Sequence, residues 1–105
     1  MQIQFNTDST VEGREKLIAY FGSVVENALN RFSDRITRVE VHLSDEHGLR
    51  NAQDSRRCVL EARLKGRQPI AVTHQAATLI QAVDGAVDRL QRAIERTVDR
   101  LDDLG

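Results

Sequence analysis

The sequence contains one cysteine, one proline, no tryptophan and only four other aromatic residues. A single cysteine, Cys58, excludes an internal disulfide framework and a metal site built on paired cysteines. No apolar run approaches the roughly 18 residues that a membrane-spanning helix needs, and the polar N-terminus does not resemble a signal peptide. We therefore expect a soluble, cytoplasmic protein with a reduced thiol and no contact with membranes.

The chain also lacks an excess of charge of either sign: 15 basic and 16 acidic residues give a formal net charge of −1. The two halves differ: residues 1–54 carry 6 basic and 9 acidic side chains (net −3), whereas residues 55–105 carry 9 and 7 (net +2). Arginine outnumbers lysine 13 to 2. The planar guanidinium group suits bidentate contacts with phosphate or carboxylate, although a codon bias of the source genome explains the excess equally well.

The 105 residues make up one domain's worth of sequence, and no repeat or linker divides them. Alternating apolar and polar residues predict strands at 3–5, 39–43, 58–64 and 70–73. Spacings of three and four predict one helix from a capping box at 9–12 to about residue 31, and another from about residue 75 to 104. The predicted buried positions of the first helix are Leu17, Phe21, Val24, Ala28 and Phe32.

This order, β-α-β-β-β-α, predicts an α+β fold in the form of a two-layer sandwich. Each predicted strand has one polar face. Both helices should therefore pack on the same face of a four-stranded sheet and leave the other face open.

The last predicted helix separates its side chains into three longitudinal stripes. Its apolar stripe comprises Leu79, Val83, Val87, Leu90, Ile94, Val98 and Leu101. An acidic stripe comprises Asp84, Asp88, Glu95, Asp99 and Asp102, and an arginine stripe comprises Arg89, Arg92, Arg96 and Arg100. Guanidinium groups on successive turns, about 5–6 Å apart, fit the spacing of nucleic-acid phosphates. A solvated face with local ion pairs such as Asp88–Arg92 and Arg96–Asp99 fits the pattern as well.

The scarcity of aromatic residues limits the kind of nucleic acid that could be bound. The open sheet face carries no aromatic ring on which an unpaired base could stack. If RNA is bound, we expect contacts with the shape and phosphates of folded or double-stranded RNA.

Signals for catalysis or for a bound cofactor are weak. His42, His47 and His74 lack the spacing of metal ligands, and His74 is expected near the start of the last helix. The glycines form no phosphate-binding loop. Cys58 lies on the same face of its predicted strand as Leu60 and Leu64. We therefore expect it to fill the core rather than to act as a nucleophile. We expect no enzyme activity, no metal, no cofactor and no small-molecule substrate.

Three segments resemble a known family. FSDRITRVEVHLSDEHG (residues 32–48), CVLEARLKG (58–66) and AVTHQAATLIQAVDGAVDRLQRAI (71–94) are similar to the bacterial ribosome hibernation-promoting factors, also called ribosome-associated inhibitors or sigma-factor modulation proteins. AVDGAVDRL (82–90) is the most specific piece. The resemblance covers nearly the whole chain, and the length resembles the short form of the family, without a C-terminal dimerisation domain.

The resemblance implies a non-enzymatic translation inhibitor that binds the small ribosomal subunit and its ribosomal RNA in stationary phase or stress, on a fold like double-stranded-RNA-binding domains. It implies a single domain over residues 1–105 that is a monomer when free. An alternative is a module for protein–protein interaction or self-association on the same fold. The RNA-binding positions that the resemblance implies are Arg89, Arg92, Arg96, Arg100, Lys16, Arg31, Arg57, Arg63, Lys65 and Arg67.

Overall fold

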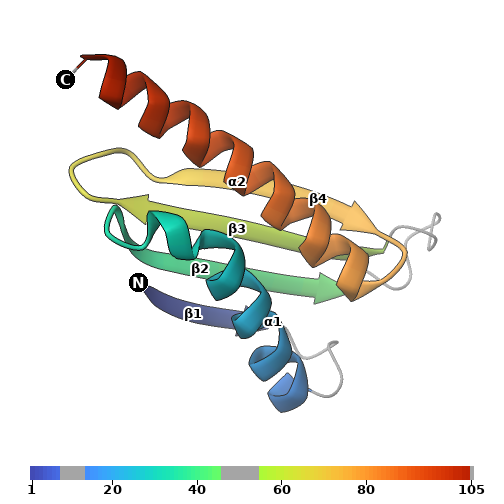
Figure 1. The fold of residues 1–105 in the computed structure, drawn as a ribbon. Coiled ribbons are helices and arrows are strands. Elements are labelled where there is room, and N and C mark those ends of the chain that lie inside the picture. The colour runs from blue at the N-terminus through green and yellow to red at the C-terminus, as the bar shows by residue number, and fades with distance from the viewer. Residues whose placement is uncertain (8–13, 46–54, 105) are drawn as a thin grey trace.

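The structure is a computed structural model that describes residues 1–7, 14–45 and 55–104, with the backbone alone for residue 14 and residues 101–104 (Figure 1). The predicted capping box at 9–12 and His47 lie outside the described residues. The elements are β1 (Gln2–Thr7), α1 (Arg14–Leu29), a 3₁₀ turn η1 (Asn30–Phe32), β2 (Ile36–Asp45), β3 (Arg56–Leu64), β4 (Ile70–Ala76) and α2 (Leu79–Leu104).

The four strands form one mixed sheet in the order β1-β2-β3-β4. β1 runs parallel to β2, while β2–β3 and β3–β4 are antiparallel. One register layer shows how the faces divide: Phe5, Val41, Leu60 and Val72 lie side by side across all four strands. These side chains face the helices, and the residues between them face the open side.

Both helices cover the same face of the sheet, as Figure 1 shows. α2 packs on β3 and β4, whereas α1 lies over β1 and touches α2 along its C-terminal part. The predicted α+β two-layer sandwich, with its order β-α-β-β-β-α, is confirmed.

The buried row of α1 differs from the predicted one. Phe21, Val25 and Leu29 are completely buried, whereas Val24 and Ala28 are only partly buried. Residues four apart form one row along a helix, and the row of Phe21 continues through Val25 rather than Val24. The helix also ends at Leu29, and Phe32 reaches the core from the 3₁₀ turn that follows.

The boundary between β4 and α2 was also predicted wrongly. The strand continues to Ala76, because Gln75 and Ala76 still pair with β3, and α2 begins only at Leu79. The hydroxyl of Thr78 accepts a hydrogen bond from the backbone N–H of Gln81 at 3.1 Å and so caps the helix start. His74 therefore lies within β4, opposite Cys58, and not beside a helix N-terminus.

The turn from β3 to β4 was predicted correctly. Gly66 adopts a φ of +66°, which a side chain would disfavour, and the N–H of Arg67 donates to the carbonyl of Leu64 at 3.3 Å. This turn carries Lys65 and Arg67 beside the C-terminal half of α2, where Val98 lines the same hollow.

Gly85 brings α2 close to β4. A Cβ atom at Gly85 would overlap the imidazole ring of His74, which points from β4 toward the helix. The glycine therefore lets α2 lie against β4 at a distance that alanine would not allow.

We expect Gly85→Ala to lower the free energy of unfolding by about 1–3 kcal/mol through overpacking. Helix propensity alone would raise it by about 1 kcal/mol, so the sign of the change separates the two effects. Denaturant unfolding measures it. The double variant His74→Ala/Gly85→Ala, which restores the space, should be at least as stable as His74→Ala alone. A Gly85→Ala protein more stable than the wild type would contradict this packing.

Candidate nucleic-acid interface

Three of the four arginines in the stripe meet β4 in one hollow. Arg89, Arg92 and Arg96 line it from α2, together with Ala71 and Thr73 of β4; its remaining lining residues are Val72 and Ala93. The hollow has a volume of about 520 Å³ and opens at the edge of the sheet.

The apolar stripe of α2 fixes the direction of these arginines. Val83, Val87, Leu90 and Ile94 are buried against the sheet, which turns the side chains on the flank outward. Arg89 and Arg96 have no ion-pair partner among the described residues. Arg100 is exposed four residues further along and does not line this hollow.

One of the two ion pairs expected along α2 is confirmed, that between Arg92 and Asp88. Arg92 contacts Asp88 at 3.1 Å between Nη2 and Oδ2, and both side chains are more than half exposed (70% and 56%). Such a solvated pair contributes about 0–1 kcal/mol, so Arg92 can exchange Asp88 for another anion at little cost. In the part of the chain that the structure describes, Arg96 and Asp99 do not pair.

A second group of cations lies at the β3–β4 turn. Lys65 and Arg67, from the β3–β4 turn, line a hollow of about 160 Å³ with Arg35, Leu64 and Val98. Asp34 completes its lining. The backbone N–H of Lys65 donates to the carbonyl of Arg35 at 3.0 Å, which joins the β3–β4 turn to the connection between η1 and β2. The sequence-based prediction missed Arg35, although this residue lies within the segment that resembles the family.

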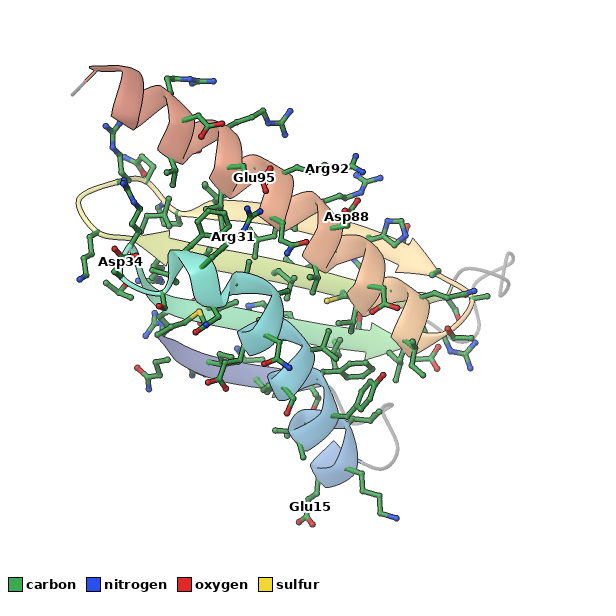
Figure 2. All side chains as sticks on the ribbon, viewed as in Figure 1. Glu15, Arg31, Asp34, Asp88, Arg92 and Glu95 are labelled. Atoms are coloured by element: carbon green, nitrogen blue, oxygen red, sulfur yellow. The ribbon has the colours of Figure 1, made fainter. Side chains whose placement is uncertain are left out.

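Arg31 connects the two helices. Its guanidinium forms an ion pair with Glu95 of α2 and lies 4.5 Å from the ring centre of Phe32. Beside it, the side-chain amide of Gln91 donates to the carbonyl of Ala28 at 2.9 Å. Figure 2 shows Arg31 and Glu95 where the helices meet. Glu95 of the acidic stripe thus pairs with a cation at the α1 side of α2, although both side chains stay about half exposed.

The remaining predicted residues lie apart from these groups. Arg57 and Arg63 project from β3 on the open face, opposite to the helices. Arg63 lies 3.6 Å from Glu40 and 3.4 Å from Glu61, so two carboxylates already share its charge. Lys16 is exposed in the first turn of α1, next to Glu15, which Figure 2 shows at the far end of that helix from Arg92.

The open face is thus an ion-paired surface. Glu40 and Glu61 lie directly opposite each other on β2 and β3, and Arg38 and Arg63 form the next layer. Arg38 lies 3.6 Å from Glu40. Arg89 and Arg96, which form no ion pair within the part of the chain that the structure describes, lie instead on the helix side at the β4 edge.

The described residues contain no group of three or more histidine, cysteine, aspartate or glutamate side chains that could hold a metal ion. Neither described helix combines the length and the apolar character needed to cross a bilayer.

The fold and this edge define a class: a two-layer α+β domain in which the arginines of one helix lie beside the edge strand of the sheet. A family model described as "Sigma 54 modulation protein / S30EA ribosomal protein" matches residues 7–102. The chain belongs to this family, and the resemblance inferred from its three segments is confirmed.

Solved structures agree with this assignment. The crystal structure of the Thermus thermophilus Protein Y N-terminal domain matches with a TM-score of 0.72 and 26% sequence identity, over 92% of this chain and 99% of that chain. A ribosomal subunit interface protein from Coxiella burnetii shares the fold, with a TM-score of 0.68 and 17% identity, over 94% and 99% of the two chains. No curated protein sequence matches the chain.

Cys58 is buried in the core, opposite Leu43 and His74 on the neighbouring strands. Burial raises the pKa of its thiol from 9.0 to about 12, because the thiolate is poorly solvated there. The pKa of the thiol is thus higher in the folded protein than in the unfolded chain. Its contribution to the free energy of unfolding is fully present below pH 9 and is lost as the pH rises toward 12, because the unfolded chain loses the proton first.

We expect the folded protein to react with a thiol-alkylating reagent at pH 8 at least about 100-fold more slowly than the denatured chain. The low thiolate fraction and the buried position both slow the reaction. Mass spectrometry of samples taken over time, with and without denaturant, measures the two rates. Equal rates would show that the thiol is accessible and would contradict its place in the core.

Proposed function

We propose that the protein is a non-enzymatic, ribosome-binding translation inhibitor of the hibernation-promoting type. In this proposal it contacts ribosomal RNA of the small subunit through basic side chains. The observation that carries the proposal is the convergence of Arg89, Arg92 and Arg96 in one hollow at the β4 edge. The family description, which names a ribosomal protein, and the Coxiella burnetii relative described as a subunit interface protein support the ribosome as partner.

The spacing of the arginines suits a phosphate backbone. At about 1.5 Å of rise per residue, Arg89, Arg92 and Arg96 are separated by about 4.5 and 6 Å along the helix axis. Each guanidinium that contacts a phosphate releases condensed counterions, which favours binding in a salt-dependent way. The two unpaired side chains, Arg89 and Arg96, can do so without breaking an ion pair.

Lys65 and Arg67 extend the basic surface on the other side of α2. They are exposed, and Arg35 lines the same hollow. RNA that spans α2 could thus contact cations on both flanks. Arg31 has a different part in the proposal: its ion pair with Glu95 holds α1 against α2 and positions the surface. Arg57 and Arg63 would require a second RNA segment on the open face.

The same proposal includes the conditions under which the protein acts. It works in the cytoplasm, in stationary phase or stress, as a single domain over residues 1–105 that is monomeric when free. It needs no cofactor and no small-molecule substrate.

The double variant Arg92→Gln/Arg96→Gln should weaken binding to purified small ribosomal subunits at least about tenfold at roughly 100 mM salt, because two phosphate contacts are lost. Co-sedimentation measures the affinity. Both side chains are exposed, so the unfolding curve should not change.

The matched control is Gln2→Glu/Asn6→Asp, which makes the same change of two charges at exposed positions on the open face of β1. Its affinity should stay within about twofold of the wild type. Equal weakening by both double variants would mean that total charge matters and the hollow does not. Unchanged affinity of the arginine variant would remove α2 from the interface.

A further inference from the structure

The edge of the sheet at β4 is open to a further strand. β4 pairs with β3 over its whole length, from Ile70 opposite Ala62 to Ala76 opposite Arg56. No strand within the described residues pairs with its other side. Successive residues of a strand direct their backbone groups alternately to the two sides, so about half of the N–H and C=O groups of β4 point away from the sheet.

This edge lacks the features by which proteins usually prevent strand addition. β4 contains no lysine and no proline, and its pairing with β3 runs without a bulge. The side chains that point to the open face are Ala71, Thr73 and Gln75, which are small or uncharged. An extended chain can therefore approach the backbone of β4 closely.

The charges beside this edge select the chain that could bind there. Arg89, Arg92 and Arg96 line the hollow together with the middle of β4, so an added strand would lie next to their guanidinium groups. Arg92 and Arg96 are separated by about 6 Å along α2. Alternate residues of an extended chain are separated by about 6.8 Å. Carboxylates at every second position would thus match the spacing of Arg92 and Arg96.

We propose that the β4 edge binds an extended acidic segment of another protein as a fifth strand. Backbone hydrogen bonds to β4 hold the segment, and alternate aspartate or glutamate side chains pair with Arg89, Arg92 and Arg96. This binding mode goes beyond the proposed contact with ribosomal RNA and uses the same arginines. The acidic segment and ribosomal RNA therefore exclude each other.

A second copy of the chain fits this edge poorly. Antiparallel pairing of two β4 strands would bring the α2 helices of both copies to the same face of the joined sheet. The two rows of arginines would then face each other across the seam, where like charges repel. An acidic strand replaces that repulsion by attraction.

The test compares two synthetic peptides on the full chain. The first is a seven-residue peptide with glutamate at every second position and valine or threonine between. The second has the same sequence with every backbone nitrogen methylated, so that it keeps the charges but lacks the N–H donors. Titration gives both dissociation constants, and amide hydrogen exchange of the protein shows which strand becomes protected.

The first peptide should bind at least about tenfold more tightly than its methylated form, and binding should slow exchange in β4 but not in β1. Arg92→Gln/Arg96→Gln should weaken it at least about tenfold, whereas Gln2→Glu/Asn6→Asp should not.

Equal affinity of the two peptides would show attraction by charge alone and would overturn strand addition. So would protection of β1 instead of β4. A protein that binds small subunits but neither peptide would show that the arginines serve RNA alone. Protection of β4 in the free protein that is lost on dilution would identify a second copy as the occupant. Each of these results would overturn the proposal while leaving ribosome binding as a separate measurement.

Discussion

Burial of the apolar stripe of α2 against β3 and β4 is the constraint on which the rest of the structure depends. Val83, Val87, Leu90 and Ile94 are almost completely removed from water, which contributes about 1.5–3 kcal/mol for each side chain. An exposed ion pair such as Arg92–Asp88 contributes about 0–1 kcal/mol. Apolar contacts therefore set the rotation of the helix, and the charged side chains occupy the positions that remain.

The near-neutral charge of the chain follows from how its acids are used. Glu95 pairs with Arg31 between the helices, while Glu40 and Glu61 neutralise arginines on the open face. These carboxylates act within the fold and leave the β4 edge with an excess of guanidinium groups. A net charge of −1 is thus compatible with one strongly positive edge and a mixed open face.

Much of this arrangement could be predicted from the sequence, because periodicity reports which side of an element is buried. The stripe of α2 and the turn at Gly66 follow from that local signal. Contacts between distant segments do not: Arg31 and Glu95 are 64 positions apart, and the place of Arg35 beside Lys65 depends on the way β2 and β3 pair. His74 was misplaced because a histidine that faces inward breaks the apolar pattern of its strand, and Gly85, which makes room for its ring, looks like a defect in a helix.

The most direct test of the central claim is the salt dependence of binding between the full chain and purified small ribosomal subunits. Contacts between about three or four arginines and phosphates should give a slope of about −2 to −4 when the logarithm of the association constant is plotted against that of the salt concentration. A slope near zero, or no binding at roughly 100 mM salt, would contradict the claim that the arginines of α2 bind ribosomal RNA.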